Sequence, residues 1–103
     1  MVRMALATLL SSLLALAFGG CGPSQIGADK DAFKAVDALY TAVSLRDPRL
    51  LDQCEKTLQS LQAKGQLPEA AGESLKAIVS EARAEKWEVA QSRLGDFMRG
   101  QRR

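Results

Sequence analysis

The sequence predicts an all-α protein in which an apolar leader precedes a small domain of four helices. Two observations predict this class: apolar residues recur at three- and four-residue spacing after Gly27, and no segment there alternates as a strand does. A third is uneven composition, because residues 1–20 hold 14 hydrophobic residues and a single charge, Arg3. We divide the chain into a leader (1–20), a connection (21–28), a helical domain (29–99) and a frayed basic tail (100–103).

The first two helices of the domain begin at aspartates that are typical N-caps. Asp29 precedes the first helix, and Asp47 precedes Pro48, which fits the first turn of the second. The second helix is expected to end near Gly65. Each helix has one apolar stripe for a shared core. The stripes are Phe33, Val36, Leu39, Tyr40 and Val43, then Leu51, Cys54, Leu58 and Leu61.

The third and fourth helices are distinguished only by the phase of their apolar residues. Pro68 opens the third helix, but no glycine or proline marks its end. On one straight helix the two stripes of this region would point about 100° apart. A break between Arg83 and Lys86 lets both stripes face one core, and therefore predicts two helices. The stripes are Ala71, Leu75, Ile78, Val79 and Ala82, then Trp87, Ala90, Leu94, Phe97 and Met98.

Apolar positions repeat when the chain is offset by 36 residues, which predicts two helical hairpins of equal size. The segment 85–90, followed by Leu94 and Phe97, resembles the second helix of a tetratricopeptide repeat. The resemblance covers residues 32–98 and implies stacked hairpins with a protein-binding groove. A closed four-helix bundle is the alternative arrangement. The candidate packing and groove residues are Tyr40, Trp87 and Phe97.

Residues 1–20 have the pattern of a secretory signal peptide. Arg3 precedes an apolar stretch that ends at Phe18 and is short for a membrane-spanning helix. The sequence Phe18-Gly19-Gly20-Cys21 follows directly and resembles the lipobox of bacterial lipoproteins. That resemblance implies cleavage between Gly20 and Cys21, a diacylglycerol on the Cys21 thiol, and acylation of the new amine, for example by palmitate.

The lipobox resemblance implies a location as well as a modification. Residues 21–28 would be a lipidated cysteine and its tether, which hold the domain at the cell envelope, on the outer membrane if the organism has one. The alternative is an ordinary signal peptide cleaved after Ala17, which releases a soluble secreted or periplasmic binding domain. An acylated Cys21 leaves Cys54 as the only free thiol, whereas a free Cys21 allows the two to pair.

The domain shows no residue pattern typical of an enzyme. The chain contains no histidine, no P-loop and no G-x-G-x-x-G motif. Cys54 lies in the middle of a helix on its apolar stripe, so we expect a small buried hydrophobe rather than a reactive thiol. Glu81, Glu85 and Glu88 have helical spacing, but the expected break passes through them and leaves solvated surface. We predict no catalytic residue, no metal and no cofactor.

Charge argues against nucleic acid as a partner. Beyond Arg3, 13 basic and 12 acidic residues are spread evenly, without the basic stripe of a nucleic-acid binder. The cluster Arg99, Arg102 and Arg103 is interpreted as a solvated tail, with contact to anionic lipid headgroups as a second interpretation. The function classes that remain are a membrane-tethered module that binds a protein, a soluble small-ligand binder and a structural envelope component.

Overall fold

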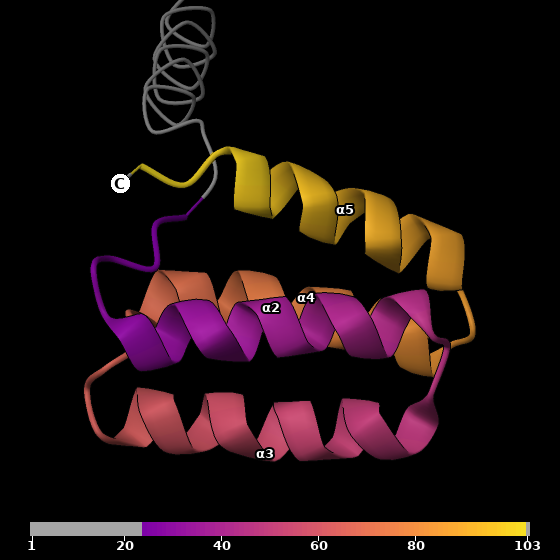
Figure 1. The fold of residues 1–103 in the computed structure, drawn as a ribbon, viewed down its shortest axis with the longest axis horizontal. Helices are drawn as coiled ribbons and strands as arrows, with labels where there is room; N and C mark the ends of the chain where they lie inside the picture. Colours follow the sequence, from indigo (N-terminus) through magenta and orange to yellow (C-terminus); the bar gives the residue numbers. More distant parts are fainter. Residues whose placement is uncertain (1–23, 103) are drawn as a thin grey trace, which may run out of the picture.

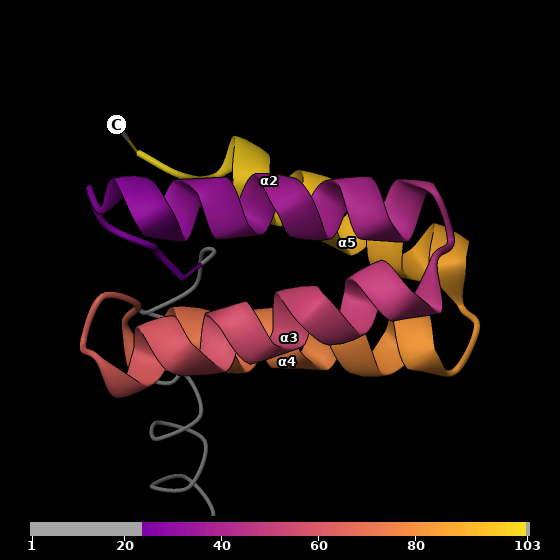
Figure 2. The same cartoon turned by 60° about the horizontal axis from the view of Figure 1, so that its bottom comes forward.

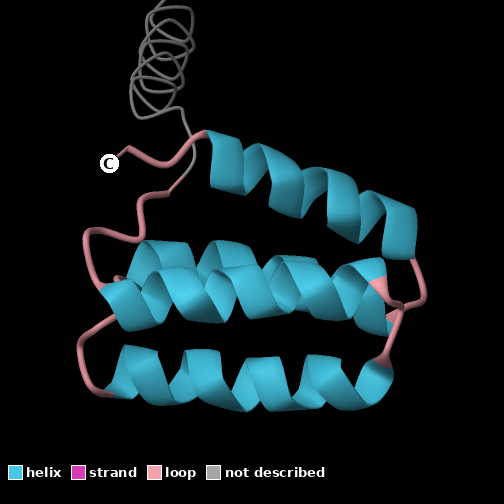
Figure 3. Cartoon of the chain, in the orientation of Figure 1, coloured by secondary structure: helices cyan, strands magenta, loops and turns pink. Residues whose placement is uncertain are grey.

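The computed structural model describes residues 24–102, and these residues form four α-helices with no strand among them (Figures 1 and 3). The helices are α2 (Lys30–Ser44), α3 (Pro48–Ala63), α4 (Glu69–Arg83) and α5 (Trp87–Arg99). Short connections join consecutive helices, so neighbours in the chain run antiparallel. The predicted all-α class and the four-helix domain are confirmed.

The four helices close into a bundle. α2 packs against α3, α3 against α4 and α4 against α5, and α5 returns to pack against α2 (Figures 1 and 2). Stacked hairpins would place the first helix of one hairpin on the first helix of the next. In this domain the first and last helices are neighbours instead. Of the two arrangements that the sequence left open, the domain therefore has the closed bundle.

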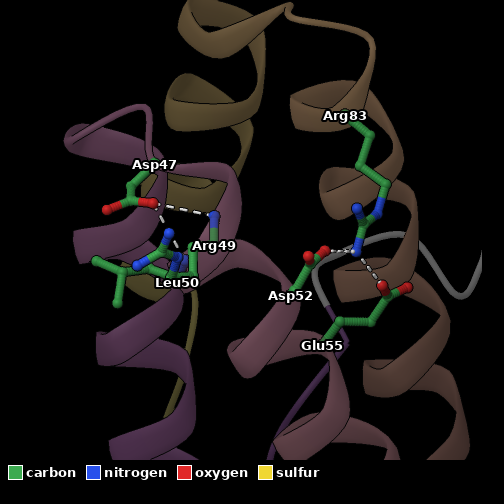
Figure 4. Close-up of polar contacts among 6 residues, drawn as sticks. All are labelled: Asp47, Arg49, Leu50, Asp52, Glu55 and Arg83. Carbon is green, nitrogen blue, oxygen red and sulfur yellow. Dashed lines mark hydrogen bonds and ion pairs between the residues drawn. The ribbon is translucent and has the colours of Figure 1, made fainter.

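The helix starts follow the predicted capping chemistry. The Asp29 carboxylate accepts a hydrogen bond from the Ala32 amide at 3.1 Å. The Asp47 carboxylate accepts from the amides of Arg49 and Leu50, at 2.9 and 3.3 Å (Figure 4). Both side chains satisfy amides that have no partner within the helix, and this explains why α2 and α3 begin where they do.

The predicted break between the third and fourth helices is confirmed. α4 ends at Arg83 and α5 begins at Trp87. Glu85 in the connection has a φ of 64°, in the left-handed region, so the chain turns and the helical hydrogen-bond ladder stops. The turn before α3 has the same feature at Arg46, where φ is 52°. Both turns lie at one end of the bundle (Figure 1).

The core contains apolar side chains from all four helices, together with Ile26, which precedes α2, and Leu67, in the connection between α3 and α4. The sequence-predicted stripes of α3 and α4 are buried throughout. The stripe of α5 is buried at its centre, while Trp87 and Met98 at its ends are half-buried. The largest fully buried side chains are Ile26, Leu39, Leu51, Leu75, Leu94, Val36, Val43 and Val79.

Tyr40 does not belong to the buried stripe of α2, because it is 36% exposed. The predicted stripe counted only large residues, whereas Ala32, Ala35 and Ala42 are also buried. At about 100° per residue, the residues of α2 that are buried centre on a direction roughly a quarter of a turn from Tyr40. Small residues therefore decide which face of α2 meets the core.

The helix boundaries repeat with an offset of 39 residues, not the 36 at which apolar positions match. α2 and α4 begin at Lys30 and Glu69 and have 15 residues each, while α3 and α5 begin at Pro48 and Trp87. The two offsets differ by three residues, which is close to one helical turn. Apolar residues therefore fall on nearly the same helix face at either offset. For this reason the apolar pattern alone did not determine how the two hairpins align in sequence.

Candidate functional site

The predicted modification site lies outside the described residues. Gly20 and Cys21, which flank the expected cleavage point, precede Ser24, the first described residue. The described residues closest in sequence to Cys21 are those where the chain enters the domain. None of the helices within residues 24–102 is long and apolar enough to cross a membrane.

The chain entering the domain is fastened to the chain leaving it by two glutamines, Gln25 and Gln101, which we call the terminal clasp. Gln25 Nε2 donates to the carbonyl of Gly100 at 3.0 Å, and Gln25 Oε1 accepts from the amide of Arg102 at 2.8 Å. Gln101 Oε1 accepts from the amide of Ile26 at 2.7 Å. These two segments are not helical, so their backbone groups have no partners of the kind that a helix provides. The side-chain amides of Gln25 and Gln101 supply hydrogen-bond partners instead.

Gln101 also donates to two carbonyls from its Nε2. The acceptors are the carbonyl of Ser24, at 2.8 Å, and the carbonyl of Phe97 in the last turn of α5, at 2.9 Å. The Ser24 hydroxyl lies 3.1 Å from that of Ser74 on α4. The entering segment is therefore bonded to both α4 and the end of α5.

The terminal clasp corrects two predictions. Residues 21–28 were expected to be a lipidated cysteine and its tether, but in the described part of this segment Ile26 is only 1% exposed and belongs to the core. The tail was expected to fray from residue 100, but residues 100–102 are hydrogen-bonded to the entering segment. The sequence does offer a sign that this segment packs on the domain, because Ile26 is the single large apolar residue between Gly22 and Asp29. The hydrogen bonds that Gln25 and Gln101 make between the chain ends could not be predicted, because these residues are 76 positions apart and no sequence pattern links them.

A continuous groove runs along the outer side of the α2–α3 pair. One part has a volume of about 530 Å³ and the other about 360 Å³, and both are lined by Ala35, Ala38 and Thr57. The groove exists because α2 offers alanines here while α3 offers Thr57 and Cys54, so no large side chain fills the space between the helices. Leu50 and Leu61 add apolar surface toward its two ends.

Basic side chains surround the end of this groove that lies toward the terminal clasp. Lys34, Lys56 and Lys64 line it together with one acidic residue, Asp31. The three lysines are exposed, and none takes part in the ion pairs formed within residues 24–102. The Asp31 carboxylate already accepts a hydrogen bond from Gln66 Nε2 at 3.3 Å. Three lysines against one carboxylate give the lining of this end of the groove a net positive charge.

The three predicted groove residues do not share a groove. Tyr40 on α2 accepts a hydrogen bond from Gln91 Nε2 on α5, at 3.4 Å, and takes no part in the α2–α3 groove. Trp87 lines a shallow pocket at the turn between α4 and α5. Phe97 is 5% exposed and lies in the separate groove between α4 and α5. Trp87 and Phe97 therefore lie at packing positions, and the three residues that the sequence offered for packing or a groove do not line one common groove.

The charged residues on α4 form pairs between helices. Arg83 pairs with Asp52 at 2.7 Å and with Glu55, both on α3 (Figure 4). The carboxylates of Glu55 and then Asp52 raise the pKa of Arg83 above its ordinary value. Glu81 pairs with Arg93 on α5 at 2.8 Å. These exposed pairs join the surfaces of neighbouring helices, where each contributes little free energy.

Acidic and thiol side chains make no recognisable metal site in the described region. Residues 24–102 contain no group of three His, Cys, Asp or Glu side chains placed to hold an ion. Cys54 is a free thiol at the base of the α2–α3 groove and is only 8% exposed. Burial raises the pKa of the Cys54 thiol, which disfavours the nucleophilic thiolate.

Fold and surface together define a small closed four-helix bundle whose two chain ends are fastened to each other. No protein family, curated protein or solved structure matches this chain.

Proposed function

We propose that this protein is a lipoprotein of a bacterial cell envelope, anchored through Cys21, whose four-helix domain binds another protein. The observation that carries the anchor is the position of the folded domain relative to the lipobox-like sequence. Within the described residues, which start at Ser24, the first core residue is Ile26, five residues after Cys21. Cleavage before Cys21 therefore leaves the described domain intact.

The location of Cys54 supports acylation of Cys21 over a disulfide between the two cysteines. Cys54 lines the α2–α3 groove, whereas Ser24 is bonded to Ser74 on the opposite, α4–α5, side of the closed bundle. Three residue steps from Ser24 back to Cys21 span at most about 11 Å. A disulfide needs Cα atoms within about 7 Å, and Cys54 is only 8% exposed and lies on the other side of the bundle from Ser24, which disfavours such a bond.

An intact-mass measurement of the protein extracted from membranes tests the anchor. We expect a chain that begins at Cys21 and carries the mass of a diacylglycerol, with or without a further acyl chain. Cys21→Ala should abolish the added mass, while the matched variant Cys54→Ala should keep it. A chain that begins at Phe18 without lipid mass would favour the soluble secreted domain and contradict the proposal.

The α2–α3 groove is the surface that we propose for the protein partner. Its alanine-lined floor and its length along two helices suit an amphipathic helix laid into it. The net positive charge that Lys34, Lys56 and Lys64 give this lining favours a helix with acidic residues flanking its apolar face. The partner is therefore expected to present an acidic amphipathic segment at the envelope.

Photocrosslinking from the groove tests this surface. A photoreactive residue at Ala38, in the groove, should give an adduct whose crosslinked peptide is rich in Asp and Glu. The same residue at Ala77, in the α4–α5 groove, should not give it. Lys34→Glu with Lys56→Glu should abolish the Ala38 adduct. Equal adducts from both positions, or none from Ala38, would instead favour a structural role in the envelope.

A further inference from the structure

The terminal clasp holds two arginines beside the point where the chain leaves toward Cys21. The Arg102 amide donates to Gln25, and Arg99 lies in the last turn of α5, next to the Gly100 carbonyl that Gln25 also binds. These residues are more than 75 positions from Cys21 in sequence. The fold therefore brings these basic side chains to the end of the domain from which the chain leaves toward Cys21. The sequence around Cys21 does not contain them.

The distance available to the anchor is short. Ser24 is fixed by its carbonyl, which accepts from Gln101, and by its hydroxyl, which lies beside Ser74. Three residue steps separate it from Cys21, so the chain spans at most about 11 Å there. An acylated Cys21 lies at the bilayer surface, which keeps the clasp end of the bundle close to the headgroups. The limit on the distance from Cys21 to Ser24 is comparable to the Debye length of about 10 Å at 0.1 M salt.

Exposed arginine side chains lie at this side of the clasp. The Arg99 side chain is 72% exposed and pairs with Asp96 on its own helix. Arg102 is exposed and forms no ion pair within residues 24–102, and Arg103 follows it in the sequence. Asp29 and Asp31 at the start of α2 are hydrogen-bonded to Gln66, and these bonds leave their negative charge in place. Guanidinium groups bind phosphate oxygens through paired hydrogen bonds.

We infer that Arg99 and Arg102 bind the headgroups of anionic phospholipids and so hold the bundle upright on its clasp end. This inference rests on the proposed acylation of Cys21. A basic residue beside an anionic surface favours the contact by about fivefold, and because Arg99 shares its charge with Asp96 the two favour it by at most about 25-fold. Such a bias is too weak to recruit a free domain, but it sets the orientation of one already tethered.

Energy transfer from Trp87 to a labelled headgroup measures that orientation. Trp87 is the only tryptophan and begins α5, while Arg99 ends it, about 18 Å away along the helix at 1.5 Å per residue. An upright bundle keeps Trp87 far from the bilayer, and a tumbling one brings it closer on average. The intact protein, extracted from membranes, would be reconstituted in vesicles that contain a dansyl-labelled lipid, made of phosphatidylcholine alone or with a quarter of phosphatidylglycerol.

We expect transfer to fall by about half when phosphatidylglycerol is present, and the effect to vanish at high salt. Arg99→Gln with Arg102→Gln should remove the dependence on phosphatidylglycerol. Arg46→Gln with Arg49→Gln, which removes equal charge at the turn end of the bundle, should retain it.

The two proposals fail in different ways. A chain without acyl mass overturns the anchor and with it this inference. An acylated chain that shows equal energy transfer in both kinds of vesicle overturns the headgroup contact alone. The same conclusion follows if Arg46→Gln with Arg49→Gln removes the dependence on phosphatidylglycerol. Circular dichroism of each variant checks that the bundle remains folded.

Discussion

The amide of Ile26 donates a hydrogen bond of 2.7 Å to the side-chain oxygen of Gln101, across 75 positions of the chain. The Ile26 side chain enters the core while Gln101 also binds the carbonyls of Ser24 and Phe97. The first and last described segments of the domain are thus one structural unit. If Cys21 carries the lipid, this unit transmits the position of the anchor to the whole bundle.

Loss of the Gln101 side chain is expected to destabilise the domain. Gln101→Ala removes three part-buried hydrogen bonds and leaves the Ile26 amide without this partner. We expect the free energy of unfolding to fall by about 1–3 kcal/mol, measured by urea denaturation. Arg102→Ala is the control, because the bond from residue 102 to Gln25 comes from the backbone and is retained. Equal effects of the two substitutions would show that the Gln101 side chain has no special role.

The close approach of α3 and α4 at Gly72 depends on one side chain. The three atoms nearest to a Cβ at this position all belong to the side-chain amide of Gln62, and the Cβ would overlap them. Alanine is favoured over glycine in a helix by about 1 kcal/mol, but here that gain is offset because Gln62 must move. We expect Gly72→Ala to change stability little in the native sequence and to stabilise by about 1 kcal/mol in a Gln62→Ala background.

A thermal or urea double-mutant cycle measures this coupling. Gly95→Ala provides the matched control, since the nearest atoms there belong to the far end of the Arg99 side chain and not to another helix. Its effect should be the same in the native sequence and in the Gln62→Ala background. Additive effects of Gly72→Ala and Gln62→Ala would contradict the predicted overlap.

The Asp29 carboxylate is expected to titrate below its usual range. The hydrogen bond from Gln66, and then that from the Ala32 amide, lower the pKa of Asp29. A folded-state pKa below the unfolded value stabilises the fold above the ordinary aspartate pKa of about 3.9, and this contribution is lost as pH falls through the folded pKa. NMR titration should show that Gln66→Ala raises the pKa of Asp29. Gln53→Ala, on the exposed side of α3, should leave it unchanged.

Cys54 is expected to react slowly while the bundle is folded. Its side chain is only 8% exposed, and burial raises its pKa, so the thiolate that attacks alkylating reagents is scarce. Alkylation of the membrane-extracted protein should be slow in buffer and rapid in denaturant, with one thiol labelled per chain. Two labelled thiols after unfolding would mean that Cys21 is free, and fast labelling in buffer would contradict the burial of Cys54.

Much of the fold follows from local chemistry in the sequence. The capping aspartates Asp29 and Asp47 determine where two helices begin, because each carboxylate binds amides only two or three residues away. The mismatch in apolar phase before and after Glu85 requires a break, since one straight helix cannot turn both stripes to one core. These features involve neighbouring residues or a fixed helical period, so they are readable without a structure.

The tertiary structure decided the closure of the bundle and the location of its surfaces. Four amphipathic helices fit stacked hairpins and a closed bundle equally well, and only the packing of α2 on α5 separates the two. The groove appears where alanines of α2 face small residues of α3, which depends on which helices are neighbours. The clasp between Gln25 and Gln101 depends on the two chain ends meeting at one end of the bundle. Local sequence carries no information on contacts made across such a separation, so pairing of this kind emerges only when the helices pack.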